Sequence, residues 1–388
     1  MSIRERVITG FKTRRQRILD GKINSIPSKL VRFREDFLGI EQKKYYVITS
    51  STKGAKTQFS SFMFIYTPLM YAYEHPDIIR VKIFYYPFEE TPEDVLTRFM
   101  SYILYIKKGV RVSPTDLNST RNDRPVSQEI LDMLESDEIK NIIDFFEANV
   151  IFSKSSNPTG VYNECKAYAR EHGTIHTRKQ KIKTNEGETI EVDVFDHYEQ
   201  SDPDEYRIIF IDHVSLLTQE RQMTLKQCID KLSEYLVTLR NDYNFSPVVI
   251  QQQAFAGESL DAFKENKVRP TIANLSDSKY PSRDCNVCMG LFSPLKHDIK
   301  TYEGYDITKL KDNVRFLELL INRSGSPGGL IALYFDGEVC NFAELPLPTD
   351  KAAIQEVYDA LERRRRTNRG TTLFSFGKLI KRIRKKNG

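Results

Sequence analysis

Along most of this sequence, short apolar segments alternate with segments that have helical spacing. The clearest apolar segment is residues 206–217 (YRIIFIDHVSLL), an almost unbroken run that contains Asp212. After it, apolar residues recur every three or four positions, at Leu225, Ile229, Leu232, Leu236 and Leu239. A run of this kind is typical of a strand buried on both faces of a parallel sheet. The alternation predicts right-handed βαβ crossovers and an α/β fold with a mainly parallel central sheet.

The other expected strands follow the same apolar or alternating patterns. They are residues 43–51, 80–86, 246–252, 286–292 and 314–322, and residues 329–335 and 338–345 form a hairpin across Asp336 and Gly337. The first strand leads into a helix over residues 56–73, which Pro68 must kink or end. Residues 178–196 predict a β-hairpin that turns near residues 185–187, inserted at about 174–204.

Composition limits the class of protein. A 40% hydrophobic content supports a sizeable core, and no apolar run is long enough for a membrane span or signal peptide. Five cysteines, an odd number, favour free thiols in a reducing cytoplasm. Residues 363–388 carry eleven Lys and Arg and no acid, and subtracting eleven from the overall +5 leaves −6 for the rest. This tail is either a site for nucleic acid or a membrane surface, or simply solvated.

The loop at residues 50–57 (SSTKGAKT) lies between a strand and a helix, where a Walker A loop cradles phosphates with backbone amides. The pattern is degenerate, because Ser50 and Ala55 stand at the usual glycine positions and the loop's glycine is Gly54. Lys56 would neutralise β- and γ-phosphate charge, and the Thr57 hydroxyl would bind Mg²⁺. Candidate phosphate contacts also come from Ser51, Thr52, Lys53, Gly54 and Ala55. An ordinary polar turn remains the alternative.

Asp212 is the second candidate metal ligand. An Asp at the end of an apolar strand is where a Walker B carboxylate holds Mg²⁺, although an Asp there can also be a turn former. The two elements occur in the expected order, each at the carboxyl end of a predicted parallel strand. Together they predict a site for ATP and Mg²⁺.

Residues 23–345 resemble the RecA-like motor domain of DnaB-type replicative helicases in the order and wording of their segments. The resemblance covers residues 23–57, 88–100 (FEETPEDVLTRFM), 206–217, 246–253 (SPVVIQQQ), 269–292 and 319–329 (LLINRSGSPGG). It implies that Glu90 polarises the attacking water, with Glu89 beside it, and that Gln253 senses the γ-phosphate. It also implies that Arg323 acts as an arginine finger on the ATP of a neighbouring subunit.

Several residues depart from the family. Ser50 and Ala55 replace glycines, and Ile321 replaces a lysine often found two residues before the finger. His213 stands where the family usually has an aromatic or another residue, and no catalytic role is expected of it. Cys285 and Cys288 are expected to be strand core rather than zinc ligands. Residues 1–22 resemble the linker helix that docks onto an adjacent subunit, and the larger domain that often precedes the motor is absent from this sequence. The motor would span residues 23–348, with a basic helical extension at 349–388.

The resemblance implies an ATP-driven helicase that works as a ring, most simply a hexamer, on single-stranded DNA. Lys264, Lys267 and Arg269 are the candidate DNA contacts. A primase or helicase loader is the implied partner, no membrane is expected, and a phage gene expressed in the host cytoplasm is the favoured origin. The alternatives are a RecA-like recombinase or recombination mediator, and a DNA-binding accessory or scaffold protein whose degenerate loop does not hydrolyse ATP.

Overall fold

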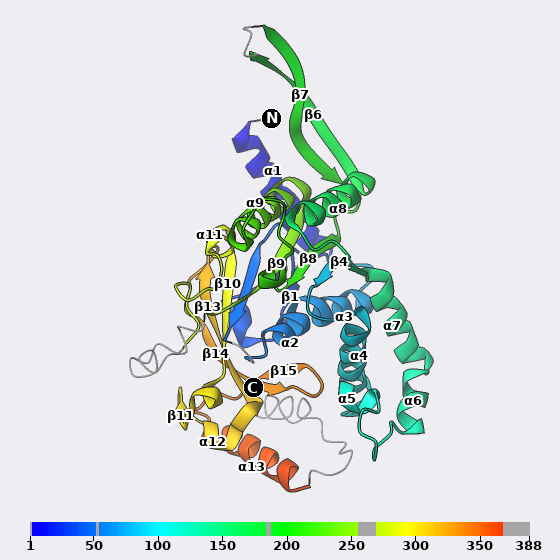
Figure 1. Ribbon diagram of the computed structural model, residues 1–388, viewed down its shortest axis with the longest axis vertical. Coiled ribbons are helices and arrows are strands. Elements are labelled where there is room, and N and C mark those ends of the chain that lie inside the picture. Colours follow the sequence, from blue (N-terminus) through cyan, green and yellow to red (C-terminus); the bar gives the residue numbers. More distant parts are fainter. Residues whose placement is uncertain (1, 52–53, 184–187, 255–268, 368–388) are drawn as a thin grey trace.

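A nine-stranded sheet forms the centre of the part of the chain that the computed structural model describes, residues 2–51, 54–183, 188–254 and 269–367 (Figure 1). The strand order is β15-β14-β13-β10-β3-β9-β8-β4-β5. In chain order the strands are β3 (Tyr46–Ser50), β4 (Arg80–Pro87), β5 (Val150–Phe152), β8 (Glu205–Asp212), β9 (Phe245–Gln252), β10 (Val287–Phe292), β13 (Val314–Asn322), β14 (Leu330–Asp336) and β15 (Asn341–Glu344). The strands from β10 to β5 run parallel, whereas β13, β14 and β15 pair antiparallel. The predicted mainly parallel sheet is confirmed.

The register of the parallel strands brings their carboxyl ends to one edge of the sheet. Ser50 at the end of β3 pairs with Gln252 at the end of β9, and Pro87 of β4 pairs with Asp212 of β8. Because β9 lies between β3 and β8, the loops that leave these strands share this edge, the usual place for a ligand in an α/β sheet.

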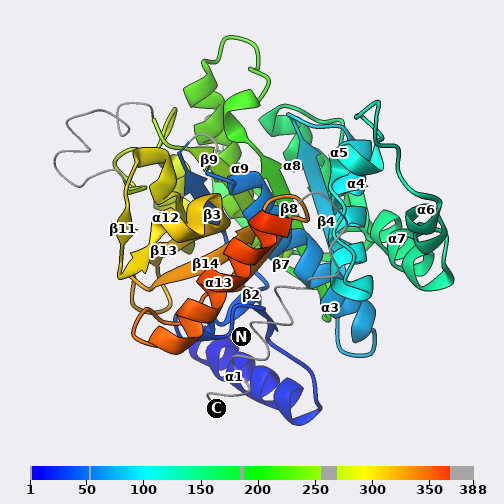
Figure 2. The ribbon, with the colours of Figure 1, turned by 90° about the horizontal axis from the view of Figure 1, so that it is seen from below.

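Helices cover both faces of the sheet (Figure 1). One face carries α2 (Lys56–Ser61), the π-helix η2 (Phe62–Tyr66), α3 (Thr67–Glu74), α4 (Pro92–Ile103) and α7 (Asp137–Asn149). The other face carries α8 (Pro158–Glu171) and α9 (Leu225–Tyr243). A separate apolar cluster joins α12 (Ile307–Leu310) and α13 (Lys351–Thr367) to the antiparallel strands, and Figure 2 shows α13 across that end of the sheet.

Local sequence explains how α4 begins and how the helical run before it passes Pro68. Thr91 caps α4 and exchanges hydrogen bonds with Asp94, and Pro92 occupies the first turn, where its missing N–H is not needed. The helix expected at residues 56–73 is present, but Pro68 does not end it. The five residues of η2 precede the first turn of α3, so the wider π turn accommodates the proline and the helical run continues to Glu74.

The predicted insertion is a separate antiparallel ribbon of β6 (Gly173–Lys183) and β7 (Thr189–Gln200), called the arm here, which stands away from the body (Figure 1). The turn expected at residues 185–187 lies outside the described residues. Short elements complete this part of the chain: β1 (Ser25–Pro27), η1 (Arg32–Glu35), β2 (Gly39–Glu41), η3 (Leu104–Lys108), α5 (Pro114–Leu117), α6 (Gln128–Leu134), η4 (Val214–Leu216), α11 (Tyr280–Asp284), η6 (Pro294–His297), β11 (Thr301–Tyr302), β12 (Tyr305–Asp306) and η7 (Lys311–Asn313).

The two chain ends differ in how they meet the body. The first helix, α1 (Ile3–Leu19), has no buried residue, and Phe11 on it is 68% exposed. In contrast, α13 is tied to the sheet by the buried Asp336, which pairs with Arg111 at 3.0 Å and Arg364 at 3.2 Å. Burial acts to raise the pKa of Asp336, but the two guanidinium groups outweigh it and lower that pKa. The basic tail beyond residue 367 lies outside the described residues.

The cysteines and the helices also bear on the expectations from composition. All five cysteines are free and buried, and burial raises the pKa of Cys285 to about 12. Cys285 and Cys288 both pack in the core beside α9. Cys288 lies in β10, as expected, whereas Cys285 caps α11 and is not part of a strand. Among the helices described, none is both long and apolar enough to cross a membrane.

Candidate active site

The loop between β3 and α2 has the strand-to-helix position that its sequence predicts. A Cβ on Gly54 would lie 2.7 Å from the Ser50 hydroxyl oxygen, so this position accepts only glycine without a local shift. Ala55 adopts the left-handed conformation, with φ 71° and ψ 29°, which strains any residue that has a Cβ. The usual second glycine is therefore replaced at a position whose backbone still favours glycine. Thr52 and Lys53 lie outside the described residues.

Thr57 and Asp212 come together across the end of the sheet. The Thr57 hydroxyl donates to Oδ1 of Asp212 over 3.3 Å, and Asp212 is 2% exposed. Burial raises the pKa of Asp212 to about 7; the hydrogen bond from Thr57 and the charge of Lys56 oppose the rise, and the charges of Glu90 and Glu89 add to it. A hydroxyl and a buried carboxylate suit Mg²⁺, which binds hard oxygen ligands and would stabilise the ionised form of Asp212.

Two glutamates follow β4, close to Asp212. Glu90 forms an ion pair with Arg98 on α4. Glu89 lies 3.7 Å from Nε2 of His213, and the Gln252 side-chain nitrogen lies 3.2 Å from the same His213 atom. Glu90 is therefore near the predicted metal ligand, but its carboxylate is already engaged by a cation.

Gln253 connects β3 to the segment that follows residues 255–268. Its side-chain nitrogen donates to the Thr49 hydroxyl over 2.8 Å, and its side-chain oxygen accepts from the Thr271 amide over 3.1 Å. Its own amide donates to the Ser50 carbonyl oxygen. Gln253 thus contacts the strand before the loop and the return of the chain after residues 255–268.

Arg315, near the start of β13, is a residue that the sequence patterns did not single out. It is 2% exposed, and its Nε donates to the carbonyl oxygen of Gly54 over 3.1 Å. Its other nitrogens donate to the carbonyl oxygens of Asp312 and Val314 and to the Asp312 carboxylate, at 2.8–2.9 Å. The guanidinium also lies 4.4 Å from the centre of the Phe335 ring. The buried Arg315 guanidinium therefore binds the backbone of the loop at Gly54.

Lys296 is a second cation that was missed. Its ammonium lies 3.5 Å from the Ser51 hydroxyl oxygen. Lys296 belongs to η6, which follows β10, and β10 is the parallel neighbour of β3. A basic residue just after β10 therefore lies beside the loop. Its position after a strand was the signal that the sequence offered for Lys296.

Arg323 lies at the opposite edge of the sheet from the loop. Asn322 pairs with Val287 of β10, which is level with Tyr46 at the start of β3. The Arg323 Nε donates to the Cys285 carbonyl oxygen over 2.8 Å, and the guanidinium also reaches the carbonyl oxygen of Arg283. Arg323 therefore cannot contact the loop of its own chain.

Of the three predicted DNA contacts, Lys264 and Lys267 lie outside the described residues. Arg269 pairs with Glu303 and lies 3.9 Å from Glu318, so its charge is partly offset. A pocket of about 280 Å³ lies between the start of α9 and residues 275–283. Three cationic side chains, one aromatic ring and three further residues line this pocket. The cations are Lys226, Lys279 and Arg283, the ring is Tyr280, and the others are Leu275, Asp277 and Ser278. Sequence reasoning did not identify this cationic pocket.

No family model and no curated protein matches this sequence. Many solved structures share its fold, among them the following two. One is described as an ATPase domain and aligns with a TM-score of 0.60 and 15% identity, over 89% of this chain and 99% of that one. A DnaB-like replicative helicase, described with its interactions with primase, aligns with a TM-score of 0.57 and 15% identity, over 88% of this chain and 67% of that one. This chain has the RecA-like ATPase fold. The RecA-like domain places Lys56, Thr57 and Asp212 at one edge of its sheet, with Arg323 at the other.

Proposed function

We propose that this protein is an ATP-dependent DNA helicase of the DnaB-like kind, which hydrolyses ATP with Mg²⁺ at the subunit interfaces of a ring. The observation that carries the proposal is the hydrogen bond from Thr57, in the first turn of α2 directly after the loop, to the buried Asp212. The likeness in fold to DnaB-like ATPase domains supports it.

The roles of the residues follow from their positions. Lys56 would neutralise phosphate charge, and Thr57 and Asp212 would hold Mg²⁺, which would offset the negative charge of the triphosphate. Gln253 would report the state of the γ-phosphate to the segment at residues 255–268, since it contacts both Thr49 and Thr271. Glu90 would orient water only after it leaves Arg98.

Arg323 would act on the nucleotide of a neighbouring subunit. It lies at the edge of the sheet opposite its own loop, so a contribution to ATP hydrolysis requires a second chain. The proposed assembly is therefore a homo-oligomer, most simply a hexamer, with α1 as the linker to the adjacent subunit. A primase or a helicase loader is the proposed partner, in the cytoplasm of the host cell if a phage encodes the protein.

Single-stranded DNA is the proposed polymer. Lys264, Lys267 and Arg269 remain the predicted backbone contacts. The pocket lined by Lys226, Lys279, Arg283 and Tyr280 would add positive charge and an aromatic face for the strand. The basic tail at residues 368–388 would add further phosphate contacts.

The test is ATP hydrolysis with and without single-stranded DNA, and unwinding of a forked duplex, on protein of measured oligomeric mass. Lys56→Ala should abolish the DNA-stimulated rate, whereas Lys140→Ala, on the exposed surface of α7, should leave it unchanged. Full DNA-stimulated hydrolysis by Lys56→Ala would contradict the proposal.

The strained Ala55 and the engagement of Glu90 by Arg98 favour a second candidate, a DNA-binding accessory protein that binds nucleotide without hydrolysing it. Nucleotide binding by the wild type with no turnover, even with DNA present, would select this candidate. Replacing Arg98 by Ala discriminates further, because freeing Glu90 should accelerate hydrolysis only where the rest of the site is competent.

A further inference from the structure

The arm is the largest feature of the fold that the proposed activity does not use. In the described part of the chain, β6 and β7 pair only with each other, out to Lys183 opposite Thr189. Beyond the bulge next to His176, no described residue of the ribbon is buried. A two-stranded ribbon with both faces in water is marginally stable, whereas further strands beside an apolar face stabilise it. The arm therefore has open edges suited to another strand.

The base of the arm, in contrast, is firmly held. The Tyr198 hydroxyl lies 2.9 Å from the Ala169 carbonyl oxygen and accepts a 2.7 Å hydrogen bond from Arg207, which is fully buried. Arg207 also donates to the His172 carbonyl oxygen over 3.0 Å. A Cβ on Gly173 would lie 2.2 Å from the Tyr198 hydroxyl oxygen, so the close approach requires glycine. These contacts attach the base of the arm to the body.

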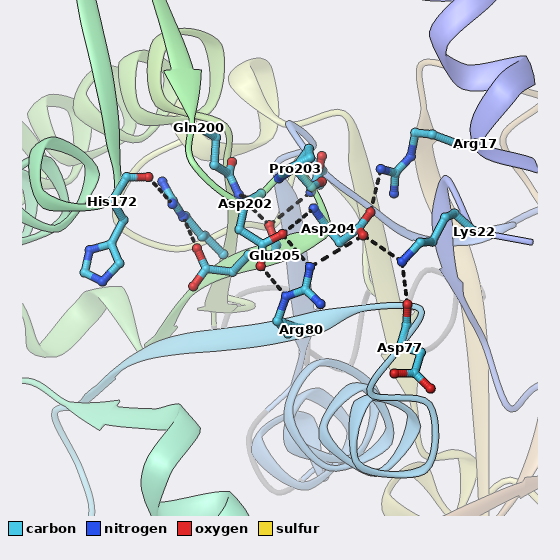
Figure 3. A network of polar contacts seen from close by, with 12 residues as sticks. Arg17, Lys22, Asp77, Arg80, His172, Gln200, Asp202, Pro203, Asp204 and Glu205 are labelled. Carbon is cyan, nitrogen blue, oxygen red and sulfur yellow. Dashed lines mark hydrogen bonds and ion pairs between the residues drawn. The ribbon is translucent and has the colours of Figure 1, made fainter. Parts of the chain in front are cut away.

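A polar network connects the base of the arm to α1 (Figure 3). Asp204, in the loop between β7 and β8, pairs with Arg17 of α1 at 2.6 Å and with Lys22 at 2.9 Å. Asp202 in the same loop pairs with Arg80 of β4. The arm and α1, which the proposed function assigns to subunit contact, therefore share one anchoring point.

The two faces of the ribbon differ in chemistry, because residues directly opposite each other share a face. One face carries the pairs Ile182–Ile190, Gln180–Val192 and Arg178–Val194, and is mainly apolar. The other carries Lys181–Glu191 and Lys179–Asp193, and the latter pair is an ion pair of 3.2 Å.

The two strands also differ in charge. β6 carries Arg178, Lys179, Lys181 and Lys183 with no acid, and β7 carries Glu191, Asp193, Asp196 and Glu199 with no Lys or Arg. The charges of the two strands cancel, which disfavours a polyanion such as DNA as the partner. Charges of both signs on each strand would suffice to protect the edges of the ribbon from aggregation. Here the positive charges lie on β6 and the negative charges on β7. Two β6 edges or two β7 edges therefore repel each other, whereas a β6 edge and a β7 edge attract.

We propose that the arm binds the arm of a second copy of this chain, with the basic edge of β6 beside the acidic edge of β7. A rotation about an axis along the arm keeps the two ribbons in the same direction, so β6 of one copy meets β7 of the next antiparallel. The apolar faces then join into one wider surface. The contact uses different edges of the two copies, and repeated rotations close a ring or extend a filament. This inference rests on the proposed homo-oligomer but not on ATP hydrolysis.

Three variants test the pairing by charge exchange. Lys179→Glu with Lys181→Glu, the acidic variant, brings the charge of β6 from +4 to 0 and leaves only acids at positions 179, 181, 191 and 193. Glu191→Lys with Asp193→Lys, the basic variant, brings the charge of β7 from −4 to 0 and leaves only lysines at these four positions. The third variant combines all four changes, which keeps the ion pairs inside the ribbon but exchanges its edges. The matched control is Arg124→Glu with Lys140→Glu, two exposed residues outside the arm, before α6 and on α7, with the same change in charge as the acidic variant. Mass photometry and sedimentation at low salt give the oligomeric mass, and circular dichroism confirms folding.

The acidic and basic variants should each associate roughly tenfold or more weakly than the wild type, because several attractive cross-strand pairs become repulsive. Their equimolar mixture should recover association. The four-change variant should associate with itself and not with the wild type, and the control should behave as the wild type. Wild-type masses for all variants, or no recovery on mixing, would overturn the pairing while the oligomer stands. A monomeric wild type would overturn both. Loss of DNA binding in the acidic variant with unchanged mass would assign the arm to DNA instead.

Discussion

Replacing Arg315 should weaken nucleotide binding, although this residue lies outside every motif of the sequence. Its Nε holds the Gly54 carbonyl oxygen at 3.1 Å. Because a trans peptide is planar, the Gly54 carbonyl and the Ala55 amide point in opposite directions. A bond that fixes the carbonyl therefore also fixes the amide, which we expect to face the phosphates. Arg315 would thus orient a donor that it does not touch.

The magnitude follows from the one bond that reaches the loop. A hydrogen bond from a charged donor contributes about 1.5–3 kcal/mol when it is buried. If Arg315→Met removes that much preference for the binding conformation, the fraction of competent loops falls, and the dissociation constant for nucleotide rises roughly 10- to 100-fold. Arg315→Lys keeps the charge but loses the fan of bonds to Asp312 and Val314, and it should fall in between.

Titration with a fluorescent ADP analogue and Mg²⁺ measures the effect, together with thermal unfolding of each variant. The matched control is Arg207→Met, which removes an equally buried arginine from the base of the arm. Both methionine variants should lower the melting temperature, but only Arg315→Met should weaken nucleotide binding. A folded Arg315→Met protein with wild-type affinity would refute the reasoning.

Three further changes give separate tests. Ala55→Gly relieves a left-handed penalty of about 1–2 kcal/mol and loses about 0.5–1 kcal/mol through backbone entropy, so thermal unfolding should show a small stabilisation. Ala148→Gly, inside α7, should instead destabilise by about 1 kcal/mol. The folded-state pKa of Asp212 is raised from 3.8 to about 7, so metal-free protein should lose stability as pH rises through that range, and Asp212→Asn should remove the trend. The pKa of Asp336 is lowered, so its contribution to the free energy of unfolding is present above pH 3.8 and is lost as pH falls further. Asp336→Asn should lower the free energy of unfolding in urea by about 3–5 kcal/mol, and an unchanged midpoint would contradict this.

Features that depend on local pattern were predictable from the sequence. The run of residues before Asp212 indicated a buried strand and placed its carboxyl at the sheet edge, because an apolar strand has few other environments. Gln253, just past the end of β9, was indicated only by the resemblance of residues 246–253 to the DnaB-type motor. The cap of α4 and the arm were also local, since Thr91 and the alternation of residues 178–196 carry their own signals.

Contacts that depend on strand order were not predictable. Arg315 and Gly54 are 261 residues apart, and Lys296 and Ser51 are 245 apart. Their meeting requires β10 beside β3 and β13 reversed beside β10, which no pattern in these strands specifies. The sequence did hold one clue, because Arg315 is a charge near the start of an otherwise apolar strand and a buried charge needs partners.

One strand, β13, carries an arginine near each end, Arg315 behind the loop of its own chain and Arg323 just past its far end. Nine extended residues span about 30 Å with little freedom to bend between hydrogen-bonded neighbours. If Arg323 reaches the nucleotide of the next subunit, a sub-ångström slide of β13 would move both arginines at once. Nucleotide binding at one site would then affect the next site through the single strand β13. Such coupling would suit ATP hydrolysis that proceeds in sequence around an assembly.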